Sequence, residues 1–402
     1  MLPIQLQNIL QSLSSQEWVK TLTSNCKLYL VGGCVRDSFL GKPIKDIDII
    51  AEGITLEEIK NTLQPFGRVG IHGESFSVLV FKPKKHKGEP YEIAIPRIDR
   101  KTGKKHTDFE VITDGIDINT DLKRRDFTIN SIAVNIENKK LLDPFNGLRD
   151  LKLKILRATD KQAFVEDPLR IIRGIQFASR FGFEIEPQTL ELMQKNSHLV
   201  KNISGERIFE ELEKILNKKG DTNLALNLLH KTGVDKALFD KKMLTYESEL
   251  EKLDPISFYY VLGLLGDVNP SKFIKTKLRG DNNTIKNVKT LDNIFKSLTT
   301  IDNDEDLKYM LFKAFNLAPE VMNSVILPGE VDEIIIQMST KKIPMTWGDI
   351  EITGDDIQNV GGIKEGPEIG LFKEKILRDA LMNRFQWNNR EKSLAYLKKI
   401  LF

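Results

Sequence analysis

The spacing of apolar positions changes character part-way along the chain. Up to about residue 148, short apolar runs are separated by polar or glycine-containing turns, which is typical of strands mixed with short helices. The strands predicted there are 28–31, 46–50, 76–82, 91–95 and 129–135. From about residue 149 onward, apolar residues recur every three or four positions, which predicts helices almost to the end. The pattern therefore predicts a mixed α/β (α+β) head followed by an all-helical remainder.

The most informative stretch joins the first two predicted strands, LYLVGGCVRDSFLGKPIKDIDII. The first strand ends at Gly32 and Gly33, where the backbone can come close to a phosphate. A short helix with Arg36 follows, and the next strand is predicted to carry Asp46 and Asp48 on one face. Two carboxylates beside a glycine turn suit a divalent metal ion bound to a polyphosphate. Because an isolated DxD pair is usually a solvated strand end, the order of these elements carries the interpretation.

Glu92 is a candidate third carboxylate. It alternates with apolar Ile93 and Ile95 on a predicted strand. Together with Asp46 and Asp48 it would complete a site for two metal ions. The alternative is a solvated glutamate on an edge strand.

The string RRDFTIN supplies a second group of polar candidates. Arg124, Arg125 and Asp126 stand at the mouth of the strand predicted at 129–135, and Asn130 lies within it. The planar arginine fork suits phosphate, and an aspartate can accept a hydrogen bond from a ribose hydroxyl. A surface salt-bridge cluster would produce the same triplet.

The segment EDPLRIIR places Asp167 and Arg170 three residues apart, with Arg173 following, on what the pattern predicts to be one helix. Cytosine and adenine both show an amino donor beside a ring-nitrogen acceptor. A carboxylate and a guanidinium match that order, whereas guanine and uracil present the opposite one, a mismatch that costs about 1–3 kcal/mol when buried. The alternative is a helix salt bridge worth a few tenths of a kcal/mol.

Taken in order, GGxVRD, DxD, RRDFTIN and EDPLR resemble the motifs of the bacterial-type (class II) tRNA CCA-adding enzymes and poly(A) polymerases, a family of nucleotidyltransferases. The resemblance covers the whole length and is most specific from about 28 to 215. It implies a polymerase β-like head at 1–148 and a helical neck with a base-recognition helix at 149–216. A helical body at 217–330 and a helical, tRNA-binding tail at 331–402 would follow.

The resemblance also implies an activity: template-independent addition of C, C and A from CTP and ATP to the 3′ end of tRNA, with release of pyrophosphate. Asp46 and Asp48 would hold Mg²⁺ in a two-metal mechanism, with Glu92 as the third catalytic carboxylate. The partner would be the acceptor end of tRNA. The residues implied to bind the nucleotide are Gly32, Gly33, Arg36, Arg125, Asp126, Asn130, Asp167, Arg170 and Arg173.

Two features of the sequence bear on which nucleotides the protein adds. Gln176 stands where the family commonly has an arginine. The polar, basic segment 96–111 is expected to be a mobile loop, and in the family such a loop helps to switch addition from C to A. Addition of CC only, of A only or of poly(A) remains open because those enzymes share every motif. A catalytically silent RNA-binding protein is a more remote alternative.

Composition narrows the class of protein further. The 402 residues suggest roughly two to four domains. With 29% charged residues and a net charge of +3, the chain is not a polybasic tail protein. Two cysteines cannot form a disulfide framework, and no apolar run approaches the ~20 residues of a membrane span. The N-terminal segment lacks the apolar core of a signal peptide, so a cytoplasmic protein is expected.

Overall fold

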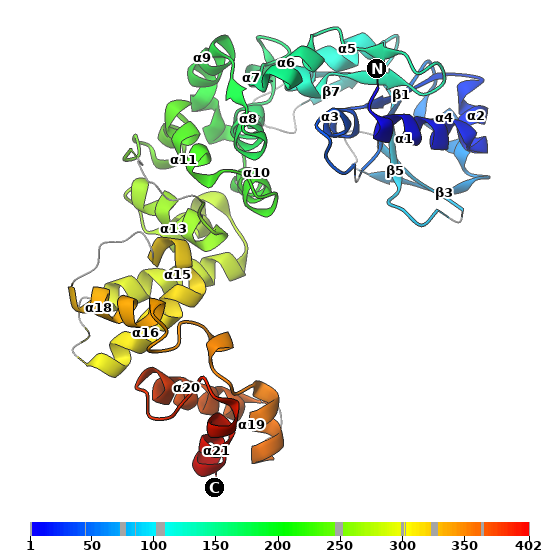
Figure 1. The fold of residues 1–402 in the computed structure, drawn as a ribbon. Helices are drawn as coiled ribbons and strands as arrows, with labels where there is room; N and C mark the ends of the chain where they lie inside the picture. The colour runs from blue at the N-terminus through cyan, green and yellow to red at the C-terminus, as the bar shows by residue number, and fades with distance from the viewer. Residues whose placement is uncertain are drawn as a thin grey trace. The chain divides into compact units, whose positions relative to one another are not determined.

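The chain forms two compact units in a computed structural model, Met1–Met243 and Leu244–Phe402. Figure 1 traces the helices and strands of both in order along the chain. The four-part division expected from the sequence stays a prediction. The residues described are 2–44, 46–72, 78–84, 86–101, 109–245, 252–298, 301, 303–322, 329–362 and 366–401.

A seven-stranded sheet organises the first unit, in the order β3-β4-β5-β2-β1-β8-β9. All neighbouring strands are antiparallel except β2 and β5, which are parallel. The strands of the sheet are β1 (Lys27–Val31), β2 (Asp48–Glu52), β3 (Gly67–His72), β4 (Val78–Pro83), β5 (Tyr91–Ala94), β8 (Ala133–Asn135) and β9 (Leu141–Leu142). Two separate ladders pair β6 (Ile98–Lys101) with β7 (Phe109–Ile112), and β10 (Ile155–Leu156) with β11 (Glu184–Ile185).

Helices cover the sheet and then continue the first unit beyond it. They are α1 (Ile4–Ser15), α2 (Glu17–Thr23), α3 (Gly33–Phe39), α4 (Leu56–Leu63), α5 (Ile118–Lys123), η1 (Thr128–Asn130), α6 (Gly147–Leu153), α7 (Ala163–Glu166), α8 (Leu169–Phe181), α9 (Pro187–Asn196), η2 (Ser197–Asn202), α10 (Gly205–Asn217), α11 (Thr222–Lys231) and α12 (Val234–Phe239). α10 and α11 both pack against α8.

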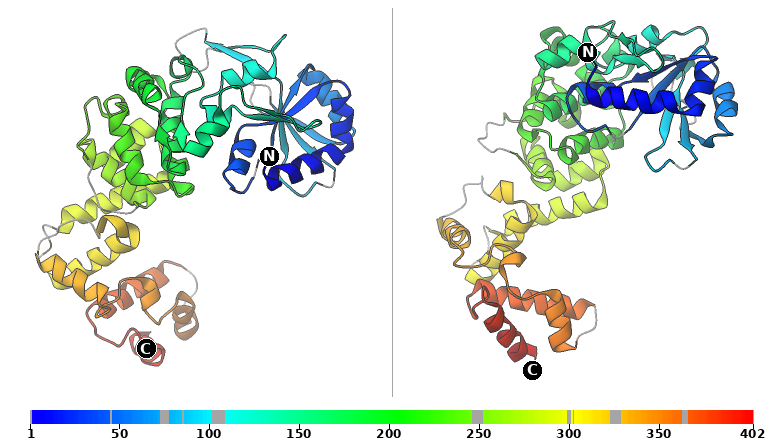
Figure 2. Two further views of the ribbon diagram at one scale, coloured as in Figure 1. Left: turned by 45° about the horizontal axis from the view of Figure 1, so that its top comes forward. Right: turned by 45° about the vertical axis from the view of Figure 1, so that its right-hand side comes forward.

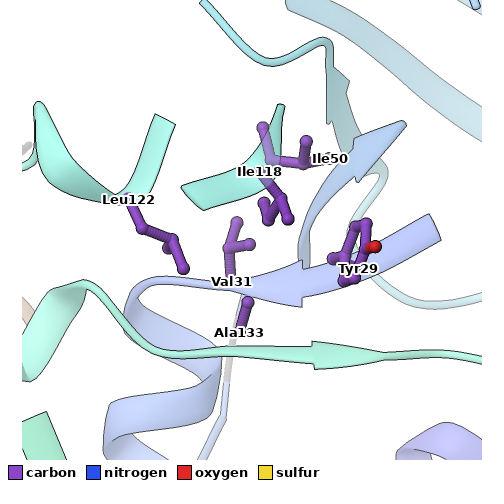
Figure 3. Close-up of a cluster of buried hydrophobic side chains, with 6 residues drawn as sticks. All are labelled: Tyr29, Val31, Ile50, Ile118, Leu122 and Ala133. Atoms are coloured by element: carbon purple, nitrogen blue, oxygen red, sulfur yellow. The ribbon is translucent and has the colours of Figure 1, made fainter. Parts of the chain in front are cut away.

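The strand register assigns each side chain to one of two sheet faces. On one face, the Trp18 ring of α2 lies 5.1 Å from the ring of Phe81 and 5.3 Å from that of Tyr91. On the other, α5 packs on the sheet, and Figure 3 shows its apolar side chains beside those of β1, β2 and β8. That second cluster consists of Tyr29, Val31, Ile50, Ile118, Leu122 and Ala133. By alternation from Ile50, Asp48 lies on the α5 face, and Glu92 is its register partner there.

The described part of the second unit is helical, as the periodicity predicts, and Figure 2 shows its helices in two further views. Its core includes the buried side chains of Phe258, Tyr259, Leu311 and Phe312. The elements are α13 (Pro255–Leu265), α14 (Pro270–Phe273), a π-helical turn η3 (Ile274–Leu278), α15 (Asn282–Leu298), α16 (Asp304–Leu317), α17 (Pro319–Met322), α18 (Gly329–Ser339), η4 (Trp347–Asp349), α19 (Gly354–Gly361), α20 (Pro367–Leu381) and α21 (Arg390–Leu401). Among the described residues, no helix is both long and apolar enough to span a bilayer.

Several expected elements are wrong in detail. Strand β3 was not predicted, and Asp46 precedes β2 instead of lying within it. The strand expected at 129–135 begins only at Ala133, so Asn130 lies in the 3₁₀ turn η1. The physical reason is local, because the Asp126 carboxylate accepts hydrogen bonds from the Phe127 N–H and the Asn130 amide and so stabilises a turn.

The helix expected around EDPLR and the loop expected at 96–111 also need correction. Asp167 lies between α7 and α8 in an extended conformation, with φ −135° and ψ 97°. A proline follows it, and the residue before a proline is disfavoured in helical geometry. Strands β6 and β7 occupy both ends of the expected loop, while residues 102–108 fall outside the described part of the chain.

Candidate active site

A cavity of about 550 Å³ lies within the first unit. It brings together all nine side chains or glycines expected to bind nucleotide, together with Asp48, although they are spread from residue 32 to residue 173. Asp46 and Glu92 do not line it. The lining residues are Gly32, Gly33, Arg36, Asp48, Arg124, Arg125, Asp126, Asn130, Asp167, Leu169, Arg170, Arg173, Gln176, Phe177, Arg180, Arg207, Lys214 and Lys218.

The carboxylate group centres on Asp48, the first residue of β2. Burial and the neighbouring Glu92 raise the pKa of Asp48 to about 6; Asp46 acts in the same direction, against Arg125 and Arg36. Among the residues described, no three potential metal-ligating side chains form a closed cluster. Mg²⁺ characteristically binds one or two protein carboxylates plus phosphate oxygens and water. A partly buried carboxylate crowded by others therefore fits a metal ion that arrives with a polyphosphate.

Gly32 makes the close approach between the turn and these charged groups possible. Its φ is +68°, a conformation that L side chains rarely adopt. A Cβ atom there would lie 2.9 Å from Nη1 of Arg125 and 3.6 Å from Oδ2 of Asp48. The glycine thus keeps open the space between the arginine and the carboxylate.

Arg36 of α3 is buried and held on several sides. Its Nε donates to Oδ1 of Asp37 at 2.8 Å, and its Nη1 donates to Oδ1 of Asn130 at 2.6 Å. The guanidinium carbon lies 5.3 Å from the ring centre of Phe177 and 5.0 Å from that of Phe181. These contacts fix the guanidinium beside the glycine turn, where phosphate is expected.

Arg124 and Arg125 share an anchor that sequence reasoning missed. Asp121 of α5 is fully buried, and its two oxygens accept hydrogen bonds from Arg124 (2.6 and 3.0 Å) and from Arg125 (3.0 and 3.2 Å). Burial would raise the pKa of Asp121, but the two guanidinium groups outweigh it and hold the pKa below its usual value. The signal was present in the sequence as spacings of three and four residues on a helix. α5 thereby aims both arginines at the cavity.

Asp126 accepts three hydrogen bonds from the protein itself. One carboxylate oxygen accepts from the Phe127 N–H and the Asn130 amide, each at 2.8 Å. The other accepts from Nε of Arg173 at 2.9 Å and lies 2.8 Å from Nη2 of the same guanidinium group. Burial opposes ionisation, but Arg173 chiefly holds the pKa of Asp126 below its usual value. These three hydrogen bonds use most of the roughly four acceptor positions of a carboxylate, so little capacity is left for a ribose hydroxyl.

The expected base-reading residues do not pair with each other. Asp167 accepts from the Leu169 N–H at 3.2 Å, and Oδ2 lies 3.8 Å from Nη2 of Arg207. Arg170 donates to the main-chain oxygens of Arg124 at 2.6 Å and Ala163 at 3.3 Å. The simple i,i+3 salt bridge considered as the alternative is therefore not formed, and the Asp167 carboxylate remains 30% exposed beside the cavity.

Five polar lining residues were not among the site residues expected from the sequence. Gln176 and Arg180 continue the cavity face of α8 after Arg173, at steps of three and four residues. Arg207 and Lys214 lie on α10, and Lys218 directly follows its last residue. Only the packing of α10 against α8 brings these last three to the site.

The head matches the family model described as "Poly A polymerase head domain" over residues 28–157. A second model, described as "Probable RNA and SrmB- binding site of polymerase A", matches residues 182–245. A CCA-adding enzyme of Lactococcus lactis subsp. cremoris is 32% identical over 400 residues, covering 94% of this chain and 93% of that protein. The chain belongs to the family of CCA-adding enzymes.

Further relatives agree with this membership. A multifunctional CCA protein of Hahella chejuensis is 41% identical over 197 residues, covering 48% of this chain and 44% of that protein. The solved structure "Thermotoga maritima CCA-adding enzyme complexed with tRNA_CCA" superposes with a TM-score of 0.62 at 25% identity, covering 100% of this chain and 97% of that one. The family resemblance, the mixed head with a helical remainder, and the assignment as a nucleotidyltransferase are thus confirmed.

Proposed function

We propose that this protein adds C, C and A to the 3′ end of tRNA from CTP and ATP, without a nucleic-acid template. The observation that carries the proposal is that one cavity holds a phosphate-accepting glycine turn, the Asp48 carboxylate, and both the Asp167 carboxylate and the Arg170 guanidinium. The first two suit phosphoryl chemistry on any nucleotide, whereas the third offers an acceptor and a donor in the order that C and A require. Membership of the CCA-adding family supports the same activity. A cytoplasmic location, where tRNA matures, belongs to this proposal.

In the proposed reaction, the 3′-oxygen of the RNA attacks the α-phosphorus of the bound triphosphate. The bond between that phosphorus and the α–β bridging oxygen breaks, and pyrophosphate leaves with that oxygen. The hydroxyl proton passes to a nearby carboxylate or to water, with Glu92 as the candidate. Arg36 and Arg125 contact the triphosphate from guanidinium groups already fixed by Asn130 and Asp121.

Asp48 and Asp46 are the side chains we assign to Mg²⁺, with phosphate oxygens and water completing its coordination. When bound, the ion supplies charge neutralisation on the triphosphate and favours ionisation of the attacking hydroxyl. The chain's own contribution is to hold Asp48 beside the glycine turn, close enough that a Cβ atom added at Gly32 would lie 3.6 Å from its Oδ2.

The decisive experiment incubates the protein with tRNA that lacks its CCA end, together with Mg²⁺, CTP and ATP, and sizes and sequences the products. A single CCA added, with no incorporation of UTP or GTP, is the expected outcome. A stop after CC, a lone A or a long ladder of A would replace the proposal with CC addition, A addition or poly(A) synthesis. Absence of any incorporation would favour the RNA-binding alternative.

A further inference from the structure

The cavity end beside the C-terminus of α8 carries more positive charge than its carboxylates can neutralise. Arg36, Arg180 and Lys218 meet there, and Asp37 is the acidic group nearest all three. Asp37 hydrogen-bonds Arg36 at 2.8 Å and lies 3.9 Å from Arg180. Among the residues described, Lys218 forms no ion pair. Burial and Arg180 lower the pKa of Lys218, as expected for cations crowded together.

Two of these cations, Arg36 and Arg180, together with Lys42, also contact an aromatic ring. The ring of Phe181 has Arg180 at 4.7 Å, Arg36 at 5.0 Å and Lys42 at 4.4 Å from its centre. A cation over a ring face keeps its N–H donors largely unused, since the attraction is to the ring quadrupole. Three cations thus surround one ring. Arg36 uses its Nε and Nη1 on Asp37 and Asn130, whereas Arg180 lies 3.9 Å from Asp37 and keeps donors for an anion.

The buried side chain of Gln176 is a second, independent indication that a ligand binds at this end of the cavity. Its side chain is 2% exposed and lines the cavity between Arg173 and Arg180. Its Nε2 makes no hydrogen bond with the described residues. A buried amide donor without a partner costs about 1–3 kcal/mol, so its persistence at a cavity wall points to a ligand that accepts from it.

We propose that Gln176, Arg180 and Lys218 form a subsite for the terminal phosphate of the incoming triphosphate, and hence for the pyrophosphate product. This inference rests on the proposed function. α8 rises about 15 Å from Arg170 to Arg180, comparable to the reach of a nucleotide from its pairing edge to its last phosphate. If Arg170 and Asp167 read the base, the polyphosphate tail points toward the far end of α8.

The position of Arg36 favours a nucleotide phosphate over an RNA backbone phosphate. Nη2 of Arg36 is close enough to Gly33 that an added Cβ there would lie 3.6 Å from it, and the guanidinium carbon lies 5.0 Å from the centre of the Phe181 ring. The subsite therefore continues the triphosphate path directly. Gln176 is neutral, so it can donate a hydrogen bond to a phosphate without adding to the repulsion among Arg36, Arg180 and Lys218. It also binds pyrophosphate less strongly than a fourth cation would, which suits a product that must leave after each of three additions.

The test compares nucleotides that differ only in their phosphates. Dissociation constants of CTP and CMP are measured in Mg²⁺ without RNA for the full chain and for Lys218→Met and Gln176→Leu. The control is Lys195→Met on an exposed position of α9 outside the cavity. We expect Lys218→Met to raise the dissociation constant of CTP about tenfold and Gln176→Leu to raise it by less. Neither change should alter the dissociation constant of CMP. Retained CMP binding also shows that each variant is folded.

Pyrophosphate inhibition provides the second readout. Its inhibition constant should rise in Lys218→Met by the same factor as the dissociation constant of CTP. If the variants weakened the binding of CTP and CMP equally, or changed neither, the proposed subsite would be rejected. Weaker tRNA binding with unchanged CTP binding would assign these residues to the RNA backbone instead. If the wild-type chain added no nucleotide to tRNA, the proposed function would fail, but the difference between CTP and CMP would still test the subsite.

Discussion

The two walls of the cavity hold their polar side chains in different ways. The head wall is built from residues 32–130 and the helix wall from residues 167–218. On the head wall, Arg36 and Arg125 have partners at 2.6 and 3.0 Å. On the helix wall, Asp167 and Arg180 have ionic partners only at 3.8 and 3.9 Å. Closely paired groups are fixed before substrate arrives, whereas loosely paired ones can exchange partners when it binds.

This difference matches what each wall would have to do. The triphosphate and the metal ion are the same in all three additions, so a rigid head wall suits them. The base changes from C to A, and pyrophosphate must leave each time, so the helix wall benefits from exchangeable partners. Three helix-wall residues depart from this pattern. Arg173 reaches Asp126 at 2.8 Å and Arg170 donates to the main-chain oxygen of Arg124 at 2.6 Å, so both tie the two walls together. Lys214 pairs with Glu211 at 2.8 Å within the helix wall.

Asp48→Ala should give the largest effect, because it removes the carboxylate at the centre of the rigid wall. Incorporation of C and A should fall by about a thousandfold or more, equivalent to about 4 kcal/mol of transition-state stabilisation. Single-turnover incorporation measures it, and tRNA binding should be nearly unchanged. Glu57→Ala, at an exposed position of α4, is the control. An active Asp48→Ala protein would remove the metal site from the proposal.

Asp121→Asn tests whether the head wall is rigid because of its buried anchor. Losing the charge that holds Arg124 and Arg125 should lower the free energy of unfolding by about 2–4 kcal/mol. Trp18 reports on the first unit in urea once Trp347 and Trp387 are replaced by phenylalanine in both proteins. Asp114→Asn, which is exposed, should change little.

The stability difference between the wild type and Asp121→Asn should depend on pH. The pKa of Asp121 is lowered in the folded chain, so its contribution is complete above the unfolded value of about 3.9. The contribution is lost as pH falls through the lower, native pKa. The stability gap between wild type and Asp121→Asn should therefore be full at pH 7 and narrow below about pH 4. A gap independent of pH would mean that packing, not charge, anchors the arginines.

The sequence predicted the head wall better than the helix wall, for a physical reason. Gly32, Arg36 and Asp48 belong to one strand–turn–helix–strand stretch, whose signals are local. Lys218 reaches the site only because α10 packs on α8, a contact that no short pattern encodes. The extended conformation of Asp167 could have been predicted, since a proline follows it. Strand β3 was missed because its two glycines and the polar Arg68 and His72, in GRVGIH, weaken the alternation that marks a strand.

Asp167→Asn should give a smaller effect, on selectivity more than on rate. An asparagine offers an amide donor as well as an acceptor, so it can face the oxo groups of uracil and guanine. We expect discrimination against UTP and GTP to relax by about ten- to a hundredfold, corresponding to about 1–3 kcal/mol. Single-nucleotide incorporation with each triphosphate in turn measures it.

Glu166→Gln is the matched control for that change. Glu166 adjoins Asp167, and its carboxylate lies 3.6 Å from Arg170, but it does not line the cavity. It should leave the order of preference intact. If Asp167→Asn lowered the rate with all four triphosphates equally, Asp167 would position α8 through its bond to the Leu169 N–H and would not read the base. The exchangeable partners of the helix wall would then serve product release alone.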